Sequence, residues 1–205
     1  RIEVLPFIAV VVLVFGLLAL VFLLMRTPNR RAAWICALPA LVCIGYLLYF
    51  FRDPQRHSPA DPGAVVAGAD GRVTSVTRLH EDCFLNMDCV RISIFLSLFD
   101  VHVNRAPLSG KSTLLGYFPG KRLFTFQEKS SEVKHNKILI EGEHTRCLVN
   151  QIVGPVCRRV VYWLPHDKPA DVAAGERIGM MKFGSRLDIY LPADSVDVVA
   201  RPGDK

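Results

Sequence analysis

The sequence has no cysteine pair at the spacing of a zinc-binding motif. Two of its six cysteines, Cys36 and Cys43, lie inside an apolar segment. The other four show no C-x-x-C spacing and no adjacent histidine pair: Cys83, Cys89, Cys147 and Cys157. Because structural zinc sites need such grouped ligands, we expect no metal. A Cys83–Cys89 bridge across a hairpin is an alternative, but buried free thiols are the favoured interpretation.

The chain also lacks a basic run with interleaved aromatic residues, and no nucleic-acid-binding motif is present. The formal net charge is +6, and it is spread over the sequence. We therefore expect no nucleic-acid partner. A mildly basic domain near a bilayer attracts anionic lipid headgroups, at about 1 kcal/mol for each basic residue close to the surface.

Charge is absent from two long hydrophobic runs, residues 7–25 and 32–51. A helix needs roughly 20 apolar residues to cross the hydrocarbon core, and Trp34, Tyr46 and Tyr49 are typical of its interfaces. The first run is too long for a signal peptide, and no small-residue cleavage site follows it. The pattern predicts a membrane-associated helical hairpin over residues 1–51, in preference to two buried core helices.

The flanking charges hardly decide the orientation of this hairpin. Three arginines lie in the turn at 26–31, and Arg52 and Arg56 follow the second run. Counted by the positive-inside rule, the two sides are nearly equal. Pro39 and Gly45 make a kinked or shallow second helix an alternative, in which the hairpin enters one leaflet and returns.

After the hairpin, a proline-rich and charged linker at 52–63 leads into a β-rich domain at 64–205. Short runs that alternate or are rich in β-branched residues predict strands, namely Gly71–Val76, Val90–Phe95, Lys137–Glu141, Thr145–Gln151, Val156–Leu164 and Arg186–Leu191. Short helical stretches are expected around Ser97–Phe99 and Ser131–Asn136. The fold class is α+β, with an N-terminal hydrophobic helical hairpin followed by a single β-rich domain.

Several polar residues are candidates for chemistry. Ser185 follows Gly184, whose backbone freedom allows a sharp bend, but an ordinary turn uses the same pair. Asp70 precedes a predicted strand, where an Asx turn is the alternative. His102 alternates with valines, as a surface histidine also would, and Arg105 suits either an anion or a surface ion pair.

Three segments together point to a family: Val66–Val73, Phe99–Gly110 and Gly179–Arg186. In this order they resemble the phosphatidylserine decarboxylases, specifically the short membrane-associated bacterial form. The resemblance covers about residues 52 to 193. It implies a catalytic triad of Asp70, His102 and Ser185, an arrangement that is recognised by roles rather than by chain order.

The resemblance also implies how the enzyme forms. The precursor would cut itself between Gly184 and Ser185, giving a large and a small chain, and Ser185 would become a pyruvoyl cofactor. That group would form a Schiff base with phosphatidylserine and release CO2 and phosphatidylethanolamine. The longer enzymes place a second histidine where this chain has Arg105, so the role of that histidine is not carried over. Arg105 and Lys182 are candidates for binding the substrate headgroup.

By the same resemblance, the enzyme is expected at the bacterial inner (cytoplasmic) membrane, with its catalytic domain facing the cytoplasm and a homodimer as a further expectation. Two other functions fit parts of the sequence. One is a pyruvoyl decarboxylase of a soluble amino acid, for which two hydrophobic helices have no use. The other is a membrane-tethered β-domain that binds lipid without chemistry, in which case Gly184-Ser185 is a turn.

Overall fold

The computed structural model describes residues 2–24, 30–61, 63–118, 135–153, 160–182 and 185–205. The chain divides into two compact units, Arg1–Asp53 and Pro54–Lys205. The first unit is helical and the second is built from strands. The fold is therefore a mixed α+β fold with two long helices and one large β-sheet.

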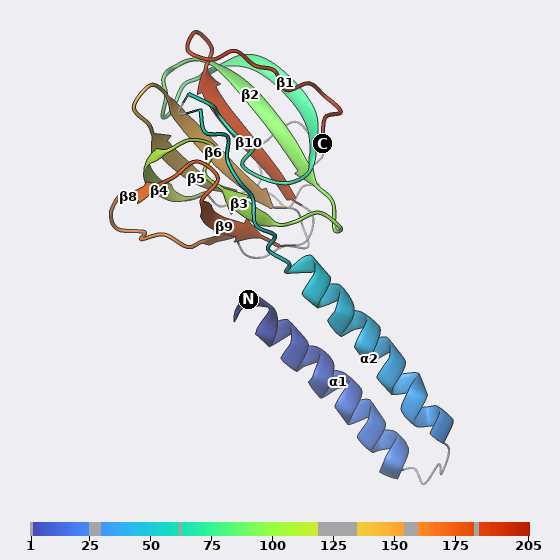
Figure 1. The fold of residues 1–205 in the computed structure, drawn as a ribbon. Helices are drawn as coiled ribbons and strands as arrows, with labels where there is room; N and C mark the ends of the chain where they lie inside the picture. Colours follow the sequence, from blue (N-terminus) through green and yellow to red (C-terminus); the bar gives the residue numbers. More distant parts are fainter. Residues whose placement is uncertain (1, 25–29, 62, 119–134, 154–159, 183–184) are drawn as a thin grey trace. The chain divides into compact units, whose positions relative to one another are not determined.

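The helical unit begins with a short 3-10 helix, Ile2–Val4, followed by α1 (Leu5–Leu24) and α2 (Arg30–Phe50). Figure 1 shows α1 and α2 running antiparallel to one another. Helices were predicted in both places, and they are confirmed. Within the described residues, no helix combines the length and apolar character that crossing a membrane requires.

The second unit contains a seven-stranded sheet with the order β1-β2-β10-β6-β5-β4-β8. Its paired strands are antiparallel. The strands are β1 (Arg72–Glu81), β2 (Met87–Leu96), β4 (Gly110–Phe118), β5 (His135–Glu141), β6 (Arg146–Val153), β8 (Ala170–Val172) and β10 (Ser185–Pro192). The last strand in sequence therefore lies in the middle of the sheet, between β2 and β6 (Figure 1).

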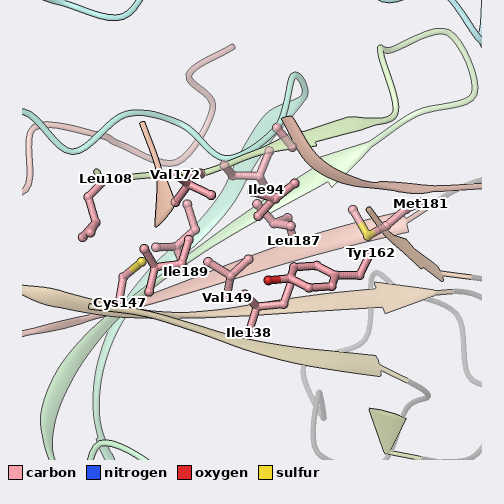
Figure 2. Packing of buried hydrophobic residues seen from close by; sticks show 14 of the residues in the cluster. Ile94, Leu108, Ile138, Cys147, Val149, Tyr162, Val172, Met181, Leu187 and Ile189 are labelled. Carbon is pink, nitrogen blue, oxygen red and sulfur yellow. The ribbon is translucent and has the colours of Figure 1, made fainter. Parts of the chain in front are cut away.

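A smaller sheet has the order β3-β9-β7, with β3 (Val103–Arg105), β9 (Arg177–Met181) and β7 (Val160–Tyr162). Apolar side chains of both sheets pack into one core: Figure 2 shows Met181 and Tyr162 of the smaller sheet in the same cluster as Leu187 and Ile189 of the larger one. Side chains alternate between the two faces of a strand, so Leu187, Ile189 and Leu191 all enter this core.

Most predicted strands are confirmed, several with longer bounds. Of the strand predicted at Val156–Leu164, the structure shows only β7 (Val160–Tyr162), and residues 156–159 lie outside the described residues. Four short or glycine-containing strands, β3, β4, β8 and β9, were not predicted. The helix expected at Ser97–Phe99 is wrong, because these residues form a turn. The helix expected at Ser131–Asn136 is wrong at its end, where residues 135 and 136 belong to β5; residues 131–134 lie outside the described residues.

The prediction of buried free thiols is confirmed in part. Cys83 and Cys89 are both free, so they form no bridge. Cys89 and Cys147 are buried as expected, whereas Cys83 is exposed. Burial raises the pKa of the Cys147 thiol to about 12, so this thiol stays neutral and packs as an apolar group. Cys157 lies outside the described residues.

Candidate active site

Ser185 is the first residue of β10 and lies at the end of a central strand. It pairs with Leu96 at the end of β2 and with Val153 at the end of β6. The side chain is fully buried, and its Oγ has no hydrogen-bond partner among the described residues. A buried hydroxyl in this state is unusual, since buried polar groups are nearly always hydrogen-bonded. Gly184, the residue before it, lies outside the described residues.

His102 is linked to the same end of the sheet by a short turn. The turn starts after Leu96, and the Asp100 carboxylate closes it by accepting from the Ser97 backbone N–H at 2.8 Å and from its hydroxyl at 2.6 Å. The His102 ring is fully buried, and Nδ1 lies 2.9 Å from the carbonyl oxygen of Asp100. Because a carbonyl oxygen can only accept, Nδ1 carries the proton. In the neutral ring, Nε2 is then the basic nitrogen.

Backbone hydrogen bonds join the His102 segment to the Ser185 segment. The Met181 N–H donates to the His102 carbonyl at 3.1 Å, and β3 pairs with β9 immediately beyond this bond. His102 is therefore held against a residue only four positions before Ser185. Two of the three segments singled out in the sequence thus lie together.

The Asp70 segment completes this arrangement. Arg72 pairs with Phe95, next to the residue that pairs with Ser185. Gly71 packs so closely on the Phe95 carbonyl that a Cβ at this position would collide with it. The Arg105 N–H also donates to the Gly68 carbonyl at 2.8 Å. All three segments therefore meet at one end of the sheet.

The Asp70 carboxylate does not contact His102 in this structure. It accepts a hydrogen bond from the Arg56 guanidinium at 2.8 Å, and its side chain remains one-third exposed. The predicted residues are therefore gathered in one region, but the direct Asp70–His102 contact of a triad is absent among the described contacts. Arg56 belongs to the segment expected to be a linker, and no sequence pattern marked it as a partner.

The two candidates for substrate binding are both buried. Arg105 donates to the carbonyl oxygens of Gly175 and Pro54, each at 2.9 Å. It also lines a small cavity of about 150 Å³ together with Arg56 and Asp70. Lys182 is 7% exposed and lies three residues before Ser185. Arg105 is therefore close to Asp70 in space, and Lys182 is close to Ser185 in sequence.

One buried ion pair was not predicted. Arg186 and Asp188 lie on the face of β10 opposite Leu187. Arg186 Nη2 donates to Asp188 Oδ2 at 3.1 Å, and Nε lies 2.9 Å from Oδ1 within the ion pair. Charged residues on an alternating strand usually face water, but both of these side chains are buried. Burial raises the pKa of the Asp188 carboxyl, while the charge of Arg186 and a hydrogen bond from Ser93 act in the lowering direction.

We predict that Asp188→Ala strongly destabilises the fold, because it leaves the Arg186 guanidinium buried without its carboxylate. Breaking one side of a buried pair costs about 3–5 kcal/mol. Urea unfolding of the variant measures this loss. The exposed Asp194, six residues further on, is a matched control, and Asp194→Ala should change the free energy of unfolding by less than about 0.5 kcal/mol. Equal stabilities for the two variants would contradict the prediction.

Glu81, at the end of β1, fixes the following turn. Its carboxylate accepts from the Phe84 and Leu85 backbone N–H groups at 2.8 and 2.7 Å, and Lys137 lies 3.8 Å away. Burial acts to raise the pKa of this carboxyl. The two backbone donors and the positive charge of Lys137 outweigh it, so the pKa is lowered from 4.5.

A lowered folded-state pKa means that Glu81 stabilises the fold above the unfolded value and loses this effect as the pH falls through the folded value. We therefore expect Glu81→Gln to lower the melting temperature at about pH 7, with the difference from wild type shrinking below about pH 4.5. Thermal unfolding over this range measures it. Glu143→Gln, at an exposed position, should show no such pH-dependent difference, and a constant gap for Glu81→Gln would refute the assignment.

Comparison with known proteins agrees with this arrangement. The family model for phosphatidylserine decarboxylase matches residues 45–205. A phosphatidylserine decarboxylase proenzyme of Carboxydothermus hydrogenoformans is 40% identical over 174 residues, which cover 84% of this chain and 80% of the relative. One of Symbiobacterium thermophilum is 42% identical over 163 residues, covering 78% and 74%. The matched region contains all three segments that meet around Ser185, and the chain therefore belongs to the phosphatidylserine decarboxylase family.

Proposed function

We propose that this chain is a proenzyme that cuts itself before Ser185 and then converts phosphatidylserine to phosphatidylethanolamine. One observation carries the proposal: the backbone brings His102 and the Asp70 segment to the end of the sheet where Ser185 is buried. Membership of the family supports the reaction, since its relatives are named proenzymes of this decarboxylase.

The surroundings of Ser185 fit a pyruvoyl group made from this residue. Its Oγ has no hydrogen-bond partner among the described residues, so no described contact is lost when the hydroxyl is eliminated. The strand that begins here is paired on both sides, which holds residue 185 after the chain is cut. A buried position also keeps bulk water from a reactive carbonyl.

In the proposed self-cleavage, Nε2 of His102 takes the hydroxyl proton of Ser185. Oγ then bonds to the carbonyl carbon of Gly184, and the nitrogen of residue 185 leaves with the proton that His102 returns. The peptide bond has become an ester. Loss of the α-proton of residue 185 expels the Gly184 carboxylate, and water then replaces the nitrogen, which departs as ammonia.

In this proposal Asp70 is the carboxylate of the triad, and its negative charge stabilises the His102 ring when that ring is protonated. Its carboxylate is held by Arg56 at 2.8 Å, so it must leave this partner to act on the histidine directly. Arg56 is exposed, and an exposed ion pair of this kind is worth only about 0–1 kcal/mol. Breaking the Arg56–Asp70 ion pair therefore costs the fold little stability.

The pyruvoyl group supplies a carbonyl that binds the substrate amine and accepts the electrons left by departing CO2. The chain's own residues bind the substrate and move protons. His102 supplies the proton that replaces CO2, because an imidazole can both accept and donate a proton. Arg105 and Lys182 bring positive charge toward the anionic headgroup, whose phosphate and carboxylate need such partners.

We also place the enzyme at the cytoplasmic face of the bacterial inner membrane. The support is the apolar surface of the helical unit, where large side chains of α1 and α2 are exposed, among them Leu13, Leu17, Leu38 and Leu41. An exposed apolar surface of this kind suits a lipid environment. Attachment there would keep the enzyme at the membrane that holds its substrate, a lipid that leaves the bilayer only at high cost.

Intact mass and a denaturing gel of the purified full-length chain test the proposal. We expect two chains, residues 1–184 and a small chain of residues 185–205 that carries a ketone instead of an amine and reacts with a hydrazide label. Vesicles containing phosphatidylserine should then yield phosphatidylethanolamine. A single chain without the ketone would overturn the proposal and leave a lipid-binding β-domain as the function.

A further inference from the structure

The turn that leads from β2 towards His102 carries two exposed apolar side chains at its tip. Its ends are Ser97 and Asp100, and the Asp100 N–H donates to the Ser97 carbonyl at 3.0 Å, as in a β-turn. The two residues between them, Leu98 and Phe99, are 46% and 66% exposed. The centre of such a turn usually holds polar residues, glycine or proline. Two large apolar side chains exposed together at one tip suit contact with an apolar surface.

The shape of this tip is fixed by Asp100. Its carboxylate accepts from the Ser97 N–H at 2.8 Å and from the Ser97 hydroxyl at 2.6 Å. Its carbonyl oxygen accepts from Nδ1 of His102 at 2.9 Å, so one residue both closes the turn and orients the histidine ring. A tip that is already ordered loses little conformational entropy when it binds another surface.

Pairing in the sheet places this tip at the end that carries Ser185. The partner of Ser185 on β2 is Leu96, the last residue of that strand. Leu98 follows two residues later, and two residues of chain span at most about 7 Å. The apolar tip therefore lies at the same end of the sheet as the residue proposed to become the pyruvoyl group.

Exposed basic residues lie at this end of the sheet as well. Arg72 begins β1 and pairs with Phe95, three residues before Leu98. The C-terminal segment returns to this point, because the Val73 N–H donates to the Asp204 carbonyl at 2.9 Å. The exposed basic residues that this pairing brings together are Arg72, Arg201 and Lys205. Positive charge beside an apolar tip is the combination that binds the surface of an anionic bilayer.

We propose that Leu98 and Phe99 insert into the interface of an anionic bilayer, while the basic residues beside them bind lipid phosphates. The inference rests on the proposed function, because phosphatidylserine is a lipid of such a bilayer. It assigns a membrane contact to the β-rich unit itself, in addition to the apolar helices. Insertion holds the end of the sheet that carries Ser185 and His102 at the level of the headgroups.

A single tryptophan at the tip tests the insertion directly. Phe99→Trp is made in a full-length chain that also carries Trp34→Phe and Trp163→Phe, and the chain is reconstituted into vesicles of phosphatidylserine and phosphatidylcholine. Bromine on the acyl chains quenches tryptophan, so we expect the emission from position 99 to be mostly lost. Emission that is equal with and without brominated lipid overturns the inference.

The matched control for this measurement is His144→Trp in the same background. His144 is exposed in the turn between β5 and β6, at the opposite end of the sheet and roughly 20 Å away along the strands. Its emission should be unaffected by bromine. If the emission from position 99 instead shifts with protein concentration in detergent without lipid, the tip is a contact between copies of the chain, which also overturns the inference.

Phe99→Ser tests whether insertion serves catalysis. The variant removes the apolar side chain, while Ser97 and Asp100 still close the turn. Turnover of phosphatidylserine in vesicles should fall about tenfold, in line with the lost apolar burial. Self-cleavage, and turnover of a short-chain phosphatidylserine dissolved as monomers, should stay at the wild-type rate. An equal loss on both substrates would assign Phe99 to the reaction site and overturn its role at the bilayer.

The basic residues are tested by a pair of variants on one strand. Arg72→Gln should lower vesicle turnover about fivefold at low salt, the effect of one basic residue near the surface. Arg78→Gln changes the net charge equally at an exposed position six residues along β1, and it should have no such effect. Equal effects overturn the role of the basic residues. A wild-type chain that stays uncut overturns the proposed function, but the quenching at position 99 still decides whether the tip inserts.

Discussion

Replacing Ser185 by alanine is expected to leave the chain in one piece and without decarboxylase activity. Ser185 is the first residue of β10. Alanine at this position has no Oγ to attack the carbonyl of residue 184. Without the cut, residue 185 cannot become a pyruvoyl group, and the substrate amine has no carbonyl to bind. Both losses should be complete, because no weaker form of the reaction remains.

The same substitution should preserve the fold. The Ser185 hydroxyl makes no hydrogen bond among the described residues, so alanine removes a buried polar group that has no partner there. Such a change is neutral or mildly stabilising. Intact mass, a lipid assay and thermal unfolding measure the three consequences in one preparation of the variant.

A buried serine elsewhere in the sheet serves as its control. Ser112 on β4 is hydrogen-bonded to the Tyr162 hydroxyl at 2.8 Å, so Ser112→Ala should lower the melting temperature yet leave cutting intact. A cut band in the Ser185→Ala chain, or lipid turnover by it, would contradict the role given to Ser185. Loss of cutting in the Ser112→Ala chain would show instead that the assay reports stability.

The central strands could be predicted because apolar residues alternate along them, as expected where one face of a strand is buried. Leu187, Ile189 and Leu191 alternate with polar residues, and they do enter the core. The short strand β3 has three residues, too few for a repeating pattern to stand out. Its place is set by pairing with β9, a contact between residues about 75 positions apart in the chain.

The resemblance of three segments named Ser185 and His102, while their residue types alone left a turn serine and a surface histidine open. The structure buries both side chains, and their partners depend on tertiary contacts. The pairing of Asp70 with Arg56 depends on how the chain folds back over the sheet. Asp188 was missed because an aspartate on an alternating strand usually faces water, whereas here Arg186 accompanies it into the interior.

The position of Ser185 also explains why cutting need not release the small chain. Strand β10 begins at the proposed cut and runs to Pro192, with β2 on one side and β6 on the other. Its apolar side chains are in the core. The new chain end is therefore held at the end of the sheet by its pairing with β2 and β6.

His102→Asn is expected to slow self-cleavage by about 10²–10⁴-fold, the usual contribution of a general base. The His102 Nδ1–H donates to the Asp100 carbonyl at 2.9 Å, and the shorter asparagine amide can retain this donor. What it lacks is the basic nitrogen at the Nε2 position. The variant therefore separates proton transfer from the placement of the turn, and the rate of appearance of the small chain measures the loss.

The matched control is His135→Asn, which alters another buried histidine. His135 stacks on Phe118 with the ring centres 5.3 Å apart, so its loss should lower the melting temperature while the cutting rate stays close to wild type. If the two variants slowed cutting equally, the effect would come from loosened packing and His102 would lose its role as the base. A slow His102→Asn chain with a wild-type melting temperature would instead leave proton transfer as the step that was removed.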